Sequence, residues 1–219
     1  WPWHYAGRLE VALVEAELHM RITVRNASMR VMPAGIGLHP YFRHAPQAVL
    51  AYDASTVWPP TAEFLAGTSR APLADEVHLP ARPLPPGGLT RYVSDWNGTA
   101  DIDLTRGARL RILADAELRH LVVHRPDNLA YLCLEPVSHV ADGFNLAARG
   151  VQGTGTRWLA PGESLSGGLR LQLLQGGQHL LRQGGVVQGQ RGADQCCHGL
   201  RPGGAGGHLS RLQVGCQRA

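Results

Sequence analysis

The sequence predicts an all-β protein, and three observations support this class. Short segments alternate between apolar and polar residues, which is the period of a strand with one buried face. The chain contains 27 glycines and 15 prolines, which favour turns between short strands. A helical period of apolar residues is weak throughout the chain. We therefore expect many short strands joined by turns.

The first expected element is a hairpin of two alternating segments, residues 9–14 and 18–25. Residues 15–17 would form the turn between them, and residues 26–28 would end the second strand. Four apolar side chains of the second segment would share one face: Leu18, Met20, Ile22 and Val24. This face is expected to meet the core.

The middle of the chain continues the pattern. Residues 58–60, Trp-Pro-Pro, look like the end of a strand and a turn, and residues 79–88 hold four prolines and two glycines, which is typical of an extended surface loop. A second hairpin is expected at residues 102–113. Its turn would lie at residues 105–107, where Gly107 supplies the positive φ that a short loop needs.

The last expected strands lie in the second half of the chain. Residues 118–124 and 129–135 flank a turn at residues 126–128. Residues 164–174 form the final strand after a Pro-Gly-Glu turn at residues 161–163.

The positive charge is confined to the end of the chain. The formal net charge is +4, but residues 1–175 carry 16 arginines and 16 acidic residues and are neutral overall. Residues 176–219 carry five arginines, one acidic residue and 12 of the 27 glycines. We therefore divide the chain into a β-domain at residues 1–175 and a Gly-, Arg- and Gln-rich tail at residues 176–219, which is predicted to be disordered.

Three interpretations of this tail remain: a flexible linker, a basic interaction segment, or sequence that is not part of the fold. The abrupt change in composition after the last strand favours the third, for example an out-of-frame reading of GC-rich DNA. A nucleic-acid-binding function is the weakest hypothesis for the protein. The 1–175 region has no net basic charge, and the tail lacks interleaved aromatic residues.

Cysteine usage and hydropathy indicate a cytoplasmic protein. Cys133 is the only cysteine in residues 1–175, so an internal disulfide is not expected there, as suits a reducing compartment. No CxxC spacing occurs, and a structural zinc site is therefore not expected. No apolar run approaches 18 residues, which argues against a membrane span, and no signal peptide follows Trp1.

Five sequence blocks occur in a characteristic order: Met32–Phe42 (MPAGIGLHPYF), Trp96–Gly98 (WNG), Leu134–His139 (LEPVSH), Phe144–Asn145 (FN) and Leu159–Ser164 (LAPGES). Together they resemble the signatures of the aldose 1-epimerases, also called galactose mutarotases, over residues 1–174. The resemblance implies an antiparallel β-sandwich of large sheets, the galactose mutarotase-like supersandwich. It also implies an isomerase that acts on a hexose without a metal or an organic cofactor.

The resemblance implies that His39 is the general acid and Glu135 the general base of this isomerase. An imidazolium and a carboxylate can exchange protons with a sugar near neutral pH. Glu135 would end the apolar strand, and Pro136 would stop the ladder after it. Partial burial at a strand end would raise the pKa of this carboxyl group and make it a better base.

The other histidines give weaker signals. His120 and His124 would share a strand face, which makes a metal site conceivable, but Val122 lies between them and favours a mixed sheet surface. His44 could help to position a substrate, although a surface loop is favoured. His139 is expected to have a structural or supporting role. The five tryptophans could stack on a sugar, but core packing is favoured for most of them.

Two features depart from the family pattern. Family members carry an N-terminal part before the segment that resembles Trp1, and it supplies an Arg and another His to the sugar site; His4 and Arg8 do not match that motif. Alignment on the block at residues 96–98 places Thr90 or Arg91 where many members carry a substrate-binding Asp. The alternative function is therefore an N-terminally truncated, inactive carbohydrate-binding or vestigial member of the family.

Overall fold

The computed structural model describes residues 1–43, 48–104, 108–127 and 129–175. These residues form fourteen β-strands and one short α-helix. All pairings between the strands are antiparallel. The predicted all-β class is confirmed.

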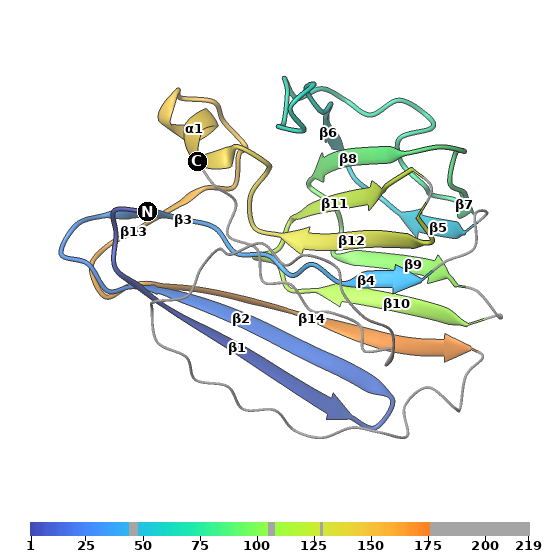
Figure 1. Ribbon diagram of the computed structural model, residues 1–219, viewed down its shortest axis with the longest axis horizontal. Coiled ribbons are helices and arrows are strands. Elements are labelled where there is room, and N and C mark those ends of the chain that lie inside the picture. The colour runs from blue at the N-terminus through green and yellow to red at the C-terminus, as the bar shows by residue number, and fades with distance from the viewer. Residues whose placement is uncertain (44–47, 105–107, 128, 176–219) are drawn as a thin grey trace, which may run out of the picture.

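The larger sheet has seven strands in the order β1-β2-β14-β10-β9-β5-β7. They are β1 (Tyr5–Val14), β2 (Glu17–Asn26), β14 (Ser164–Gln175), β10 (Arg109–Ala114), β9 (Thr99–Asp103), β5 (Val49–Tyr52) and β7 (Arg82–Pro83). Both predicted hairpins are confirmed, because β1 pairs with β2 and β9 pairs with β10. The long strands β1, β2 and β14 run side by side along one end of this sheet (Figure 1).

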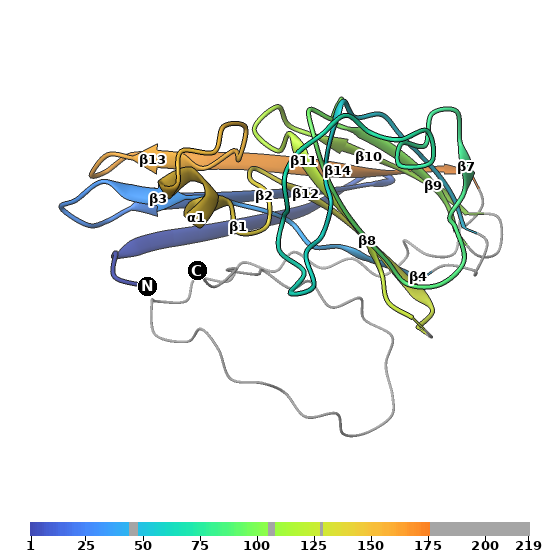
Figure 2. The same ribbon diagram turned by 90° about the horizontal axis from the view of Figure 1, so that it is seen from above.

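The second sheet has five strands in the order β4-β12-β11-β8-β6. They are β4 (Tyr41–Arg43), β12 (Tyr131–Val137), β11 (His120–Arg125), β8 (Leu89–Ser94) and β6 (Thr56–Trp58). A small third sheet pairs β3 (Met32–Ala34) with β13 (Arg157–Leu159), and α1 (Gly143–Ala148) follows β12 in the chain. Both views place α1 at the end of the molecule where β3 and β13 meet (Figures 1 and 2).

The hydrophobic core lies between the two large sheets. The five-stranded sheet contributes Leu121, Val123, Leu132 and Leu134, all fully buried. The seven-stranded sheet contributes Met20, Ile22, Leu50, Ile102, Ile112 and Leu169. Alternation along each strand places these side chains inward and their neighbours outward, as the period of two requires. The architecture is therefore a sandwich with one apolar interior.

The structure corrects the expectation that Pro136 ends its strand. β12 continues to Val137, and Pro136 pairs with Leu121 of β11. In an antiparallel strand the N–H and C=O of one residue point to the same side. The Pro136 carbonyl accepts from the Leu38 N–H, on the side away from β11. The missing N–H of Pro136 therefore costs no bond to β11.

Two smaller expectations also change. The segment at residues 79–88 is not a simple surface loop, because Arg82–Pro83 forms β7 against β5 and Leu84 is buried in the core. The helix α1 was not expected, since six residues are too few to show a helical period.

Some expectations concern residues outside the described ranges. They include the turn at residues 105–107, His44, Asn128 and the tail at residues 176–219. Within the described ranges, no helix has the length and hydropathy that a bilayer span requires.

Candidate active site

His39 and Glu135 come from segments that main-chain hydrogen bonds hold together. Glu135 lies on β12, and His39 lies on the connection between β3 and β4. Leu38 N–H donates to the Pro136 carbonyl at 3.0 Å, and Ser138 N–H donates to the Ile36 carbonyl at 2.8 Å. This connection therefore runs alongside β12 as a short additional strand.

Gly37 permits this close approach. It forms an isolated bridge with Val137, and a Cβ atom at Gly37 would lie 2.5 Å from Val137 Cγ1. A distance this short is not tolerated between carbon atoms, so a larger residue would push the connection away from β12. The position of His39 relative to Glu135 depends on this glycine.

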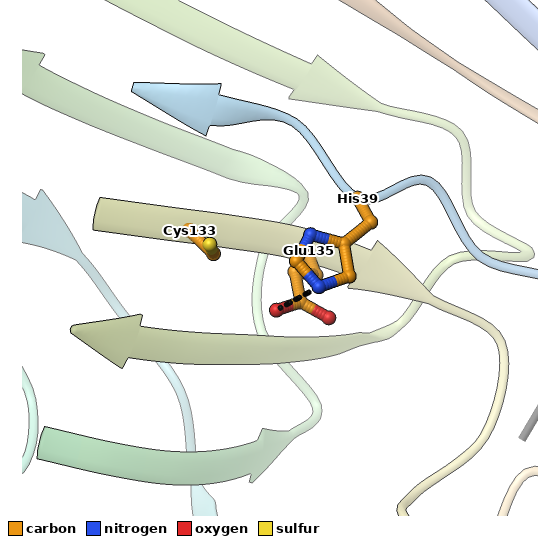
Figure 3. Close-up of side chains that lie close together, drawn as sticks. All are labelled: His39, Cys133 and Glu135. Atoms are coloured by element: carbon orange, nitrogen blue, oxygen red, sulfur yellow. Dashed lines mark ion pairs between the residues drawn. The ribbon is translucent and has the colours of Figure 1, made fainter. Parts of the chain in front are cut away.

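The structure brings the two predicted residues into direct contact. His39 Nε2 lies 3.2 Å from Glu135 Oε1 (Figure 3). The His39 side chain is 29% exposed and that of Glu135 only 12%. The Tyr41 ring stacks on the His39 imidazole, with 4.5 Å between centroids and 15° between planes. Stacking and the contact with Glu135 together restrict the imidazole orientation.

Burial shifts both residues toward their uncharged forms. It raises the pKa of Glu135 to about 8, and it lowers the pKa of His39 from its ordinary value. Between these pKa values the pair binds one proton in total. Moving that proton across the 3.2 Å contact converts the neutral pair into an imidazolium and a carboxylate. One partner is therefore an acid and the other a base.

The pair opens into a pocket of about 100 Å³. Its titratable lining residues are His39, Glu135 and His139. The other lining residues are small or apolar: Gly35, Ile36, Gly37, Leu38, Val122, Val137, Ala141 and Phe144. An apolar wall with a few polar groups is the usual composition of a small-molecule site.

His139 is a wall of this pocket, a more direct position than the sequence suggested. Its ring stacks on Phe144 at a centroid distance of 5.0 Å, with the planes 5° apart. The imidazole also packs on Gly35, where a Cβ atom would overlap it. Burial lowers the pKa of His139 to about 4, so the ring is neutral near pH 7. A neutral imidazole at this place can accept or donate one hydrogen bond.

His120 and His124 do not form the conceivable metal site. His120 Nδ1 lies 2.7 Å from Ser94 Oγ, and His124 Nδ1 lies 2.9 Å from Thr90 Oγ1. Among the described residues, neither histidine belongs to a cluster of ligand groups. The Nδ1 atom of each histidine is therefore within hydrogen-bonding distance of a hydroxyl group on β8, as expected for a mixed sheet surface. His120 is nevertheless buried rather than surface-exposed.

The two residues aligned with the family's substrate-binding Asp have different surroundings. Arg91 is buried and donates to Tyr52 Oη and to the Glu76 carbonyl, so it has a structural role. Thr90 instead pairs in register with His124 on β11. Asp95, the nearest acid, forms an ion pair with Arg119 at 3.3 Å and does not line the pocket.

The tryptophans that the structure buries serve the core. Trp58 and Trp96 are 2% and 3% exposed and donate to Ser94 Oγ and the Leu118 carbonyl, respectively. No tryptophan is among the residues that line the pocket within the described ranges. Core packing, the interpretation favoured for most of the tryptophans, therefore holds for these two, whereas Trp1 and Trp158 are each 53% exposed.

Cys133 is the site neighbour that the sequence interpretation missed. It lies two residues before Glu135 on β12, and the side chains of both residues gather with His39 on one side of the strand (Figure 3). The donor atoms of His39, Cys133 and Glu135 all lie within 4.8 Å of one another. The alternation along residues 131–137 already places Cys133 and Glu135 on one face, so this signal was available.

Comparisons with known proteins identify the family and the fold of this chain. The family model described as aldose 1-epimerase matches residues 1–172. The uncharacterized protein YphB of Escherichia coli strain K12 is 29% identical over 181 residues, which cover 78% of this chain and 61% of YphB. The crystal structure of a candidate aldose 1-epimerase from Escherichia coli K12 superposes with a TM-score of 0.69 at 26% identity, covering 78% of this chain and 60% of that one.

A galactose mutarotase-like protein from Clostridium acetobutylicum shares the fold, with a TM-score of 0.62, 22% identity and coverage of 77% of this chain and 56% of that one. The predicted sandwich type is therefore confirmed. The chain spans about 60% of the length of its first relatives.

Proposed function

Since the chain belongs to the aldose 1-epimerase family, we propose that it interconverts the α and β anomers of a hexose. In this proposal His39 is the general acid and Glu135 the general base. The observation that supports it most strongly is the contact of 3.2 Å between these two side chains at the wall of a pocket. The required partner is a small sugar, with no metal or organic cofactor in the reaction.

The chemistry needs one group that accepts a proton and one that donates a proton. Glu135 as carboxylate would remove the proton of the C1 hydroxyl. His39 as imidazolium would protonate the ring oxygen O5 while the C1–O5 bond breaks, which gives the open-chain aldehyde. Rotation about C1–C2 and reclosure with the roles reversed would give the other anomer. The two protonation states are restored at the end of the cycle.

The single proton shared by the pair suits this reaction. With two protons the pair contains no base, and with none it contains no acid. Burial favours one proton per pair, because it raises the pKa of Glu135 and lowers that of His39. A sugar hydroxyl that enters between the two groups could take the place of their direct contact.

The test is anomer exchange. The full chain is incubated with galactose or glucose, and the exchange between α and β signals is followed by NMR saturation transfer or polarimetry. We expect acceleration above the rate in buffer. A folded protein that leaves both rates at the buffer value would refute the proposal for these sugars.

A second candidate function is sugar binding without catalysis. One observation favours it: the pocket of about 100 Å³ is small compared with typical ligand sites of about 300–1,000 Å³, so it would enclose a hexose only in part and position it less firmly than catalysis needs. Saturable sugar binding by calorimetry together with an unchanged exchange rate would support this candidate. The cytoplasmic location stays a prediction, based on the single cysteine of residues 1–175.

A further inference from the structure

The acid–base pair has a thiol beside it that the proposed reaction does not use. Cys133 is fully buried and lies next to Glu135 on the same face of β12, where His39 reaches across from the neighbouring segment (Figure 3). One nitrogen, one sulfur and one oxygen donor are therefore gathered within 4.8 Å.

This donor set matches the ligand preference of zinc. Zinc binds imidazole nitrogen at about 2.0–2.1 Å, thiolate sulfur at about 2.3 Å and carboxylate oxygen at about 2.0–2.2 Å. In a tetrahedral site such bonds place the donors about 3.3–3.8 Å apart. The donor atoms here lie within 4.8 Å of one another, so the widest separation has to close by about 1 Å when the ion binds. Magnesium and calcium prefer oxygen ligands alone and fit this set poorly.

The charges also balance. A thiolate from Cys133 and a carboxylate from Glu135 neutralise the two positive charges of Zn²⁺, while His39 binds as a neutral ring. A neutral complex matters here because Cys133 is fully buried and the Glu135 side chain is 12% exposed. The pocket gives an ion access to His39 and Glu135, which both line it, whereas Cys133 is not among its lining residues.

We propose that His39, Cys133 and Glu135 form a three-ligand binding site for Zn²⁺, and that the bound ion blocks the acid–base pair. Binding releases the proton of the Cys133 thiol, because the thiolate is the form that binds the metal. The ion then occupies His39 Nε2 and a Glu135 oxygen, the atoms that the proposed mutarotation needs. Only this blocking effect rests on the proposed function, because binding itself does not depend on activity.

The experiment must separate this site from the tail, which contains further cysteines. The full chain is therefore prepared with Cys196→Ser, Cys197→Ser and Cys216→Ser, and Zn²⁺ is titrated from a chelator-buffered solution by calorimetry. Repeating the titration in buffers of different ionisation enthalpy gives the number of protons released. The matched variant adds Cys133→Ser to the same background.

We expect one Zn²⁺ per chain with release of protons, and an affinity at least tenfold weaker after Cys133→Ser. Equal affinity with and without Cys133→Ser would overturn the proposal, and so would the absence of saturable binding. Should Cys133→Ser fail to fold, Co²⁺ decides the question in the background chain. A thiolate-to-cobalt charge-transfer band can then arise only from Cys133 and supports the site, whereas its absence overturns it.

The blocking effect is measured separately as anomer exchange at increasing Zn²⁺. At a free Zn²⁺ concentration ten times its dissociation constant, we expect about a tenfold loss of rate. Full activity of the zinc-saturated chain would overturn the blocking part alone. A chain that binds zinc but never catalyses exchange would count against the proposed function and leave the metal site standing.

Discussion

The acidic side chains on the outward faces of the two large sheets differ in their exposure and in their partners. On the seven-stranded sheet, arginines of β10 face aspartates of β9: Arg109 lies 2.5 Å from Asp103, and Arg111 lies 2.6 Å from Asp101. On the five-stranded sheet, Glu135 is largely buried and contacts a histidine. The Arg109 hydrogen bond lowers the pKa of Asp103, whereas burial raises the pKa of Glu135 to about 8.

The difference shows what separates a scaffold surface from a reactive one in the same fold. Exposure and a permanent cation keep an aspartate charged at all ordinary pH values, so it has no proton to exchange. Burial, by raising the pKa of Glu135 to about 8, leaves this carboxyl group close to the point where it gains or loses a proton near neutral pH. The protein can therefore bear many charges and yet concentrate proton transfer at one place.

The largest effect is expected from replacing His39 or Glu135, because either change removes one member of the acid–base pair. His39→Ala and Glu135→Gln should each reduce the rate of anomer exchange by about 10²–10⁴-fold, the usual contribution of a general acid or base. The matched control is Asp103→Asn on the other sheet, which should leave the rate within about twofold because its ion pair is exposed. Saturation-transfer NMR measures all three. Retention of the wild-type rate by Glu135→Gln would contradict the assignment of the base.

The inward faces of the sheets should behave alike. Ile112 on the larger sheet and Leu132 on the smaller one are both fully buried in the common core. Replacement of either by Ala should lower the free energy of unfolding by about 2–5 kcal/mol, because each leaves a cavity. Denaturant titration measures the loss. A cost below about 1 kcal/mol for one of them would show that the two sheets do not share one packed interior.

The carboxyl groups on the two outward faces should also differ in how they change stability with pH, because burial raises the pKa of Glu135 whereas Arg109 lowers that of Asp103. The pKa of Glu135 is about 8 in the folded chain and about 4.3 when unfolded, so between these values the folded chain binds more protons. Rising pH therefore destabilises the wild type through this residue, and the effect is absent below about pH 4.3.

Glu135→Gln carries no such proton. Its stability relative to the wild type should rise by about 4 kcal/mol between pH 4.5 and pH 8.5, because each unit of pKa difference between the folded and unfolded chain corresponds to about 1.4 kcal/mol. Thermal unfolding of both proteins across this range gives the difference, and the titrating groups that do not contact Glu135 cancel in it. Parallel curves for the two proteins would show that Glu135 is not desolvated.

The smallest effect concerns the exposed ion pairs. A double-mutant cycle on Arg111 and Asp101 should give a coupling energy below about 1 kcal/mol that decreases further with added salt. Chemical denaturation by urea at two ionic strengths provides the measurement. A coupling of several kcal/mol, insensitive to salt, would mean that this face is no simple solvated scaffold.

The sequence predicted what depends on local pattern. Alternation placed Met20 and Ile22 on one face of β2, and both are buried. The order of the sequence blocks led to His39 and Glu135, and these side chains do meet. Their function as acid and base stays a prediction, because proximity alone does not establish it.

What the sequence left out depends on which strands become neighbours. The closeness of Cys133 to His39 follows from the pairing of Gly37 with Val137, 100 positions apart in the chain. β12 can continue past Pro136 because the position where its N–H is missing faces away from β11. Neither fact can be obtained from the residues next to it in sequence.

The main-chain hydrogen bonds between residues 36–38 and β12 have one more consequence. They fix the spacing of His39 and Glu135 through groups that almost every amino acid possesses, Leu38 N–H and the Pro136 carbonyl among them. Side-chain replacements around the site can therefore accumulate over evolutionary time without moving the two residues apart, provided that Gly37 is kept. The spacing of the two residues is thus encoded in backbone contacts rather than in the identity of the surrounding side chains.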